Sequence, residues 1–327
     1  MKIEIIDYLR RNKAKIVSRR EGLEKIKRSN AINSQIRYYN FYDIDWESFW
    51  FTFFLKTRTH FSHMDKQVAF FSNFGERECL NKAKGDIRIF FTGENLRSRF
   101  LQYGDNMLND PTIDLALGFD YFEDKRYMRF PLWMHYMFEG NSSDEEICQQ
   151  IEKLRHPSIG ERERFCAMVA SHDFDCVREK ITKEIATISQ VSCGGKFMHN
   201  DETLKSEFND NKKEYLSHFV FNICPENTNA YGYVTEKIFE SIVSGCIPIY
   251  WGSYNDPEPQ IINKDAVIFF EPGKDNSKQI TFIEELWSHP KLLSEFQHQD
   301  RLKSTAEDEI LSVIYKLADK LDYLIKK

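Results

Sequence analysis

The sequence predicts an α/β protein built on parallel sheets. Short apolar runs rich in β-branched and aromatic residues recur along the chain, with amphipathic helical patterns between them. The run at residues 219–223 does not alternate with polar residues, which is typical of a strand buried on both faces and therefore of a parallel sheet. Because 327 residues exceed the size at which one hydrophobic core usually keeps growing, two domains are expected.

The first half of the chain contains three of these apolar runs, at residues 68–72, 87–92 and 115–119. A turn-rich stretch at residues 140–146 follows them and is the best break in the pattern. We therefore predict an N-terminal α/β domain over residues 1–150 and a C-terminal α/β domain with C-terminal helices over residues 151–327.

The second half begins with an apolar run at residues 165–170, followed by an amphipathic helix that carries Arg178 in its first turn. The apolar residues of this helix share one face: Val177, Ile181, Ile185 and Ile188. A further amphipathic segment at residues 309–325 predicts a helix that packs on the core rather than a membrane anchor.

The most informative unit lies at residues 219–252. Four residues with turn chemistry follow its first strand: Asn227, Thr228, Asn229 and Gly232. Thr235 is a suitable N-cap, so a helix should begin near it, and Gly245 should end that helix before a second strand at residues 247–251. In such a βαβ unit, ligand groups gather at the carboxyl end of the first strand, where nucleotides bind.

Charged residues stand at the start of this predicted helix. Lys237 lies in the first turn, where its positive charge interacts unfavourably with the helix dipole at a cost of about 0.3–1 kcal/mol. Free backbone amides, the dipole and the ammonium together predict a pyrophosphate site, with Glu236 accepting hydrogen bonds from sugar hydroxyls. From the spacing alone, an ordinary exposed Glu–Lys pair is an equally good interpretation.

Three blocks in this unit, at residues 225–228, 231–237 and 245–252, resemble the signature of the α1,3/α1,4-fucosyltransferase family, glycosyltransferase family 10, in its bacterial branch. Further similar segments occur in the expected order: residues 91–95, 116–120, 126–132 and 168–171, followed by Arg178. The resemblance spans roughly residues 65–270. It departs from the family at residues 172–177 and at Pro225, where an aromatic residue is usual and where proline removes a backbone donor beside the expected nucleotide.

The resemblance implies a GT-B type fold, two Rossmann-like domains facing across a cleft, with the acceptor bound mainly by the first and GDP-fucose by the second. The resemblance assigns Glu94 as the catalytic base. Without the resemblance, an N-cap or a surface carboxylate would be the better interpretation of this residue. The residues assigned to the donor are Arg178 and Lys237 at the diphosphate, with Glu236, Asn227, Tyr233 and Ser171 nearby. The implied activity is an inverting transfer of L-fucose to a hydroxyl of an oligosaccharide or lipid-linked glycan.

The expected acceptor hydroxyl is that of GlcNAc in an N-acetyllactosamine (LacNAc) type glycan, giving an α1,3 linkage, with surface-polysaccharide assembly as the setting. Two alternatives remain open at this point. One is a GT-B transferase that uses another nucleotide sugar. The other is a non-catalytic protein that binds carbohydrate or nucleotide.

No metal or other cofactor is expected. The cysteines show no CxxC spacing, and His60 and His63 have no third ligand nearby. Two Asp-x-Asp triplets begin at Asp43 and Asp173, but neither closes a long buried strand as a metal-holding triplet of a GT-A enzyme would. Two cations, Arg178 and Lys237, can instead neutralise the leaving diphosphate.

Charge is distributed unevenly along the chain. Residues 1–28 carry a net charge of +6, which leaves −12 on the remainder and argues against a nucleic-acid partner. This basic leader suggests either contact with an anionic membrane surface or, as we favour, a solvated helix with Ile3, Ile6 and Leu9 facing the core. With no spanning apolar run and no secretory signal, a cytoplasmic location is expected, with peripheral contact at the inner membrane face as the alternative.

Overall fold

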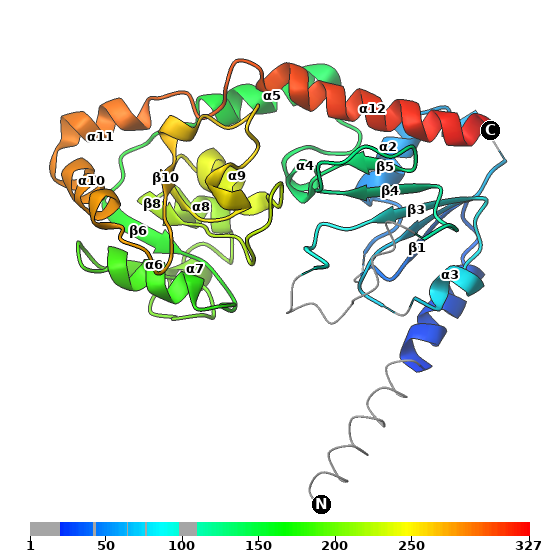
Figure 1. Cartoon of the computed structure of the whole chain (residues 1–327), viewed down its shortest axis with the longest axis horizontal. Helices are drawn as coiled ribbons and strands as arrows, with labels where there is room; N and C mark the ends of the chain where they lie inside the picture. The colour runs from blue at the N-terminus through cyan, green and yellow to red at the C-terminus, as the bar shows by residue number, and fades with distance from the viewer. Residues whose placement is uncertain (1–19, 42–43, 64, 76, 98–109) are drawn as a thin grey trace, which may run out of the picture.

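Two five-stranded parallel sheets form the frame of the molecule, one in each half (Figure 1). The computed structural model describes all residues except 1–19, 42–43, 64, 76 and 98–109. The first sheet has the order β1-β2-β3-β4-β5, with strands at Ile36–Tyr39, Val68–Phe71, Ile87–Phe91, Leu115–Gly118 and Tyr127–Arg129. The second has the order β10-β9-β8-β6-β7, and its strands β6 to β10 are Arg164–Met168, Val191–Cys193, Phe219–Ile223, Ile247–Tyr250 and Ile268–Phe269. The predicted α/β class with parallel pairing is confirmed.

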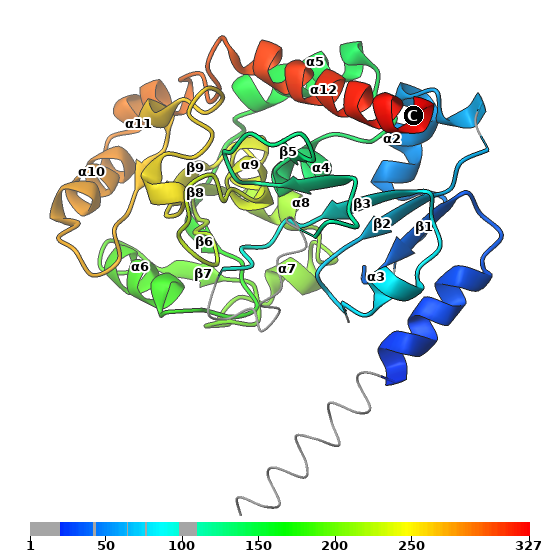
Figure 2. The same cartoon turned by 45° about the vertical axis from the view of Figure 1, so that its right-hand side comes forward.

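Helices flank both sheets (Figure 2). Those of the first half are α2 Trp50–Arg58, α3 Cys79–Lys82, α4 Leu132–Met137 and α5 Asp144–Arg155. Those that follow are α6 Val177–Ile185, α7 Thr203–Ser206, α8 Lys212–Leu216, α9 Glu236–Val243, α10 Ser277–Ser288, α11 Pro290–Gln297 and α12 Ala306–Lys326. Short 3₁₀ turns lie at Phe61–His63, Ser253–Asn255 and Lys264–Ala266.

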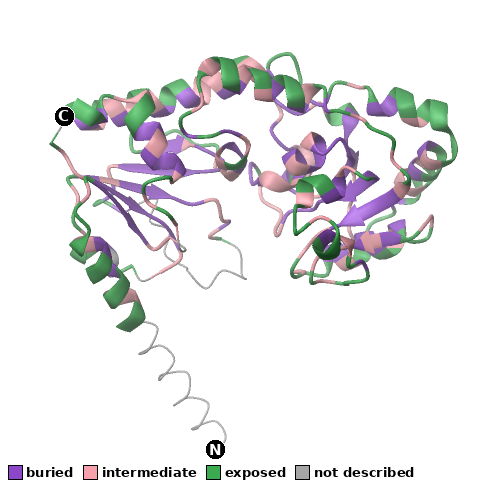
Figure 3. Cartoon of the chain, turned by 180° about the vertical axis from the view of Figure 1, so that it is seen from behind, coloured by how far each residue is buried: buried purple, intermediate pink, exposed green. Residues whose placement is uncertain are grey.

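The strands of both sheets are almost wholly buried, whereas the outer helices expose one face (Figure 3). The C-terminal helix α12 buries an apolar stripe, as its spacing predicted: Ile310, Ile314, Leu317, Leu321 and Ile325. This stripe packs against α2 and α5, so the end of the chain returns to the first half (Figure 1). The division of the chain at residue 150 stays a prediction.

Apolar and charged contacts join the two halves. The Trp133 and Phe239 rings stack with centroids 4.2 Å apart, which holds α4 against α9. Beside them, Arg129 Nη2 of β5 forms a 2.6 Å ion pair with Glu258 Oε1, and the Trp133 indole donates a 2.8 Å hydrogen bond to the same oxygen. This contact fixes the first sheet relative to the loops of the second.

The basic leader is described only in its last part. Residues 20–31 form a helix, and Ile26 of this helix is buried in the core of the first sheet. The predicted core-facing residues Ile3, Ile6 and Leu9 lie outside the described residues. No helix of the described part of the chain is both long enough and apolar enough to cross a membrane.

Candidate active site

All seven residues predicted for the site line one cavity of about 390 Å³ between the halves. They are Glu94, Ser171, Arg178, Asn227, Tyr233, Glu236 and Lys237. The first half contributes Glu94 together with Leu132 and Tyr136 of α4, and the second half contributes the remainder of the wall. The cavity therefore lies at the carboxyl ends of β3, β6 and β8, the edge at which parallel sheets bind ligands.

The turn between β8 and α9 brings Asn227 and Tyr233 into the wall, and the first turn of α9 brings Glu236 and Lys237. Gly232 has φ +78°, and a Cβ there would meet the Phe119 carbonyl oxygen at 2.8 Å, so the turn requires glycine. Helix α9 begins at Glu236 with Thr235 in the N-cap position, as predicted. The Thr235 hydroxyl, however, does not cap the helix; it donates to Glu226 Oε2 at 2.6 Å.

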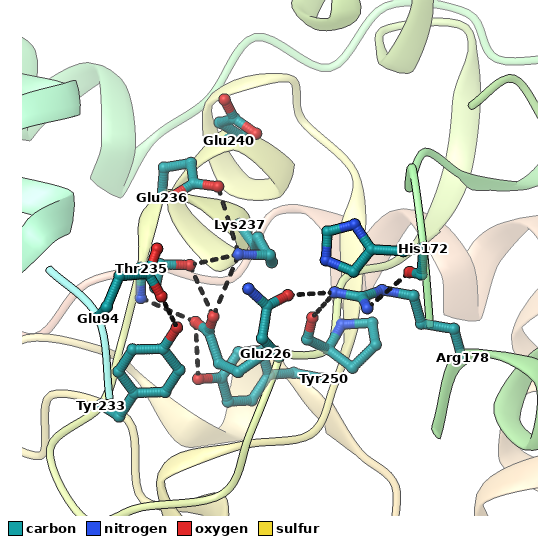
Figure 4. Close-up of polar contacts among 12 residues, drawn as sticks. Glu94, His172, Arg178, Glu226, Tyr233, Thr235, Glu236, Lys237, Glu240 and Tyr250 are labelled. Carbon is teal, nitrogen blue, oxygen red and sulfur yellow. Dashed lines mark hydrogen bonds and ion pairs between the residues drawn. The ribbon is translucent and has the colours of Figure 1, made fainter. Parts of the chain in front are cut away.

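Glu226 supports the cavity from beneath, and the sequence analysis did not single it out. Its side chain is fully buried and accepts hydrogen bonds from the Thr235 amide (2.8 Å), the Thr235 hydroxyl (2.6 Å) and the Tyr250 hydroxyl (3.2 Å). The Lys237 ammonium lies 3.4 Å from the same carboxylate (Figure 4). The sequence did offer a signal for this residue: its carboxylate comes three residues after a buried strand and directly before the turn residues.

The Lys237 ammonium is held at the centre of these groups. It donates to Thr235 Oγ1 at 2.8 Å and to Glu236 Oε1 at 3.3 Å (Figure 4). Burial alone would lower the pKa of Lys237, but the carboxylates of Glu226 and Glu236 outweigh it and raise that pKa. Burial likewise would raise the pKa of Glu236, and the Lys237 charge reverses the effect and lowers it. The cavity thus keeps a permanent cation.

A second cation, Arg178, lines the same cavity on the side away from Glu94 (Figure 4). Its guanidinium donates to the His172 carbonyl at 2.9 Å and to Asn227 Oδ1 at 2.8 Å. Burial lowers the pKa of Arg178, with Asp173 and Glu226 acting in the opposite direction. Because an arginine stays protonated even when its pKa falls somewhat, the side chain presents a fixed positive fork.

The proline that departs from the family pattern also contacts Arg178. The Pro225 carbonyl accepts from Arg178 Nη2 at 3.4 Å. On either side of it, the Cys224 amide donates to the Ile249 carbonyl of β9 at 3.0 Å, and the Glu226 amide donates to the Trp251 carbonyl just after β9 at 2.8 Å. A proline between two such residues removes no hydrogen bond to that strand.

Glu94 enters the cavity from the first half. Its amide donates to Thr92 Oγ1 at 3.1 Å, and its Oε2 accepts a long 3.5 Å hydrogen bond from the Tyr233 hydroxyl (Figure 4). Burial raises the pKa of Glu94, opposed by the Lys237 charge and reinforced by that of Glu236. A carboxylate with a raised pKa is a better proton acceptor near neutral pH.

Asp173 of the second Asp-x-Asp triplet is used structurally. Its carboxylate accepts from the amides of Arg178 and Glu179, at 3.0 and 2.9 Å, and so satisfies the start of α6. The residues that the structure describes contain no group of three metal-ligating side chains. Asp43 of the first triplet lies outside those residues.

Two family models match the chain along most of its length. One, described as the alpha-(1,3)-fucosyltransferase FucT N-terminal domain, matches residues 36–136, and the other, described as the glycosyltransferase family 10 (fucosyltransferase) C-term, matches residues 159–312. The chain belongs to glycosyltransferase family 10. The resemblance drawn from the short motifs is confirmed, and the family-10 match extends beyond residues 65–270 on both sides.

Several proteins named as fucosyltransferases are similar in sequence. The alpha-(1,3)-fucosyltransferase FucT of Helicobacter pylori is 28% identical over 66% of this chain and 48% of its own length. The alpha-(1,3)-fucosyltransferase B of Drosophila melanogaster is 28% identical over 37% of this chain and 29% of its own. The chain thus spans about half or less of the length of these curated relatives.

Solved structures of an alpha1,3-fucosyltransferase share the fold. One aligns with a TM-score of 0.60 at 22% identity, covering 89% of this chain and 90% of the other. Another, determined with GDP-fucose, aligns with a TM-score of 0.53 at 23% identity and covers 80% and 78% of the two chains. Together with the two parallel α/β halves, this likeness confirms the predicted GT-B type fold of a family-10 protein.

Proposed function

We propose that this family-10 protein transfers L-fucose from GDP-fucose, with inversion, to a hydroxyl of a glycan acceptor. The observation that carries the proposal is one cavity with a carboxylate on one wall, Glu94, and two cations on the other, Arg178 and Lys237. The names of the relatives and the GDP-fucose complex of a protein with this fold support the donor. The linkage we propose is α1,3 to GlcNAc of a LacNAc-type acceptor.

The second half of the chain has to stabilise the departing diphosphate. As the bond between fucose C1 and the phosphate oxygen breaks, its electron pair moves to the diphosphate, and negative charge grows there. Arg178 is buried and the Lys237 side chain is 19% exposed, and both cations are fixed by their partners, so they can stabilise that charge without reorganising. Glu236, Asn227, Tyr233 and Ser171 line the rest of the donor wall.

The first half of the chain has to supply a base for the acceptor hydroxyl. Inversion needs the acceptor oxygen to attack C1 on the face opposite the departing diphosphate, through a transition state with oxocarbenium character. Glu94 takes the proton from that hydroxyl as the new C1–O bond forms, and later releases it to solvent. Its raised pKa suits this role.

We also propose that the reaction needs no metal or other cofactor, because the two cations already occupy the diphosphate wall. Activity retained in excess chelator and not increased by added Mg²⁺ or Mn²⁺ supports this. Activity abolished by chelator and restored by a divalent ion contradicts it.

The function is tested by incubating the protein with GDP-fucose and LacNAc, followed by linkage analysis of the product. The expected result is a fucosylated product with an α1,3 bond to GlcNAc and release of GDP. Parallel reactions with UDP and CMP sugars test the other-donor alternative, and nucleotide binding without any turnover would favour the non-catalytic alternative.

A further inference from the structure

Four exposed aromatic side chains gather at the mouth of the cleft beside the candidate active site. They are Tyr121, Phe122, Tyr231 and Tyr254, and all four line a second cavity of about 580 Å³. These four make up a large share of the big apolar side chains that the described residues expose. Such clustering of exposed aromatics marks an interaction site rather than chance.

The cavity adjoins the candidate active site at Asn95, which lines this cavity and directly follows Glu94 in the chain. Asn95 Nδ2 donates to Thr228 Oγ1 at 3.0 Å across the two halves. The remaining lining is polar or small: Arg97, Asp120, Asn229 and Ala230. The aromatic rings therefore line the same cavity as Asn95, one residue along the chain from the carboxylate that faces the acceptor.

The aromatic surface is held in place by contacts beneath it. The Tyr121 and Tyr231 rings, one from each half, lie 5.1 Å apart, and the Arg129 guanidinium covers Tyr121 at 4.1 Å. The Phe122 ring stacks on Tyr127 at 3.8 Å. The Tyr254 amide donates to Asn229 Oδ1 at 2.7 Å, which ties the turn after β9 to the turn before α9. The rings of Tyr121, Phe122 and Tyr231 are thus pre-organised, and the Tyr254 backbone is tied to the same surface, which lowers the entropic cost of binding.

The chemistry of this cavity fits a neutral sugar chain. Sugar rings offer apolar C–H faces that pack on aromatic rings, and hydroxyl edges that bond to amides and charged groups. The charged pair at the mouth, Arg97 and Asp120, carries both signs, so the cavity has no excess of positive charge for a second nucleotide or an anionic lipid. Its volume lies within the range of small-molecule sites.

We propose that this surface, formed by Tyr121, Phe122, Tyr231 and Tyr254, is the subsite for the acceptor sugars beyond the one that receives fucose. The inference rests on the proposed function, because it takes the reacting sugar to lie at Glu94. It makes the enzyme prefer an oligosaccharide over a single sugar, since only a longer acceptor reaches the rings.

The test compares Tyr254→Ala, Tyr254→Phe and Tyr231→Ala with the native chain, using GlcNAc and a LacNAc-containing tetrasaccharide as acceptors. Tyr323→Ala on α12 is the matched control, because Tyr323 and Tyr254 are equally exposed, at 67% and 66%, and Tyr323 does not line this cavity. We expect both alanine variants to raise the KM for the tetrasaccharide about five- to tenfold. The KM values for GlcNAc and GDP-fucose should stay unchanged, and the Phe and Tyr323 variants should behave as native.

An unchanged KM for the tetrasaccharide in both alanine variants would overturn the inference. An equal rise for GlcNAc and for the tetrasaccharide would also overturn it, because the effect would then lie at the reacting sugar. Saturation-transfer NMR of the tetrasaccharide without donor separates this inference from the proposed function. If the native chain transfers no fucose, the proposed function is wrong. Binding signals that are lost in Tyr254→Ala and kept in Tyr323→Ala would still support the subsite in that case.

Discussion

Glu94 combines the position and the environment that a general base needs. It faces the cation-lined wall, and burial raises its pKa, so the carboxylate holds a transferred proton more firmly than an exposed glutamate would. We expect Glu94→Gln to lower kcat by about 10²–10⁴-fold while GDP binding is kept, because the amide fills the same space but takes no proton. Initial rates and calorimetric titration with GDP measure the two quantities; near-native turnover would remove Glu94 from the role.

The same residue predicts the acid limb of the pH profile. The base works only when deprotonated, so kcat/KM should fall as the pH drops through the pKa of Glu94. Because that pKa is raised, the fall should begin at a higher pH than the ordinary glutamate value of about 4.3 would give. Rates from pH 4 to 8 check this, after unfolding has been excluded at each pH by circular dichroism.

Glu226 acts one layer below the cavity, through the groups that it holds. Removing its charge leaves Lys237 with Glu236 as its remaining carboxylate partner at less than 4 Å. We expect Glu226→Gln to lower the free energy of unfolding by about 1.5–3 kcal/mol, the usual contribution of hydrogen bonds to a buried charged group, and to raise the KM for GDP-fucose. Urea unfolding measures the first effect and initial rates the second.

The control for Glu226 is Glu240→Gln on the same helix α9. Glu240 forms a 2.5 Å ion pair with Lys212, but both side chains are about 30% exposed, at 29% and 31%. Such a partly solvated pair contributes about 1 kcal/mol or less. Equal losses of stability in the two variants would contradict the placement of Glu226 as the buried anchor.

At the scale of elements, Asp201 joins the start of β6 to α7 and α8. Its carboxylate accepts from the Thr203 amide (3.0 Å), the Thr203 hydroxyl (2.7 Å) and the Tyr215 hydroxyl (2.9 Å), and it pairs with Arg164. Burial would raise the pKa of Asp201, but these donors outweigh it and hold that pKa well below its usual range. The pKa of Asp201 is lower in the folded chain than the value near 3.9 expected in the unfolded chain, so the ionised carboxylate stabilises the fold at pH values above about 3.9. This stabilisation is lost as the pH falls toward the pKa of the folded chain.

We therefore expect the native chain to exceed Asp201→Asn in stability at pH 7, and this gap to shrink by about 1 kcal/mol between pH 5 and pH 3. Urea unfolding at these pH values measures the gap. Asp319→Asn is the control, because it removes the same charge from the exposed face of α12 without touching the network. A gap that stays constant with pH would show that Asp201 titrates alike in the folded and unfolded chain.

The sequence predicted the elements whose pattern is long enough to read. Strands β2, β3, β4, β6, β8 and β9 all fall on the predicted apolar runs. Four strands were not predicted: Ile36–Tyr39, Tyr127–Arg129, Val191–Cys193 and Ile268–Phe269. The last three have only two or three residues, which carry no period and become strands only through their neighbours in the sheet. Thr235 shows the same limit: its position was predicted, but its bond to Glu226 depends on where β8 ends.

The site was predictable as far as short motifs reach. Glu94 and Lys237 are far apart in the sequence, and it was the resemblance, not the spacing, that brought them together. Contacts between the halves carry no local pattern at all: Arg129 and Glu258 are separated by 129 positions, and neither was singled out. Their pairing follows only from the packing of α4 on α9, which places the ends of both sheets side by side.

At the scale of the whole molecule, that pair joins the two halves. Arg129 donates to the Phe119 carbonyl (3.0 Å), the Gly232 carbonyl (3.3 Å) and Glu258, whose side chain is only 3% exposed. Arg129→Met leaves the Glu258 charge buried without its counter-ion, so we expect the free energy of unfolding to fall by about 3–5 kcal/mol.

The double variant Arg129→Met/Glu258→Gln should be more stable than Arg129→Met alone, because the buried uncompensated charge is gone. Lys274→Met serves as the control: its pair with Glu271 is exposed at the surface, and its loss should cost less than about 1 kcal/mol. Urea unfolding of the variants measures these differences. Additive losses in the double variant would mean that the two residues act independently and would contradict their role as a buried ion pair between the halves.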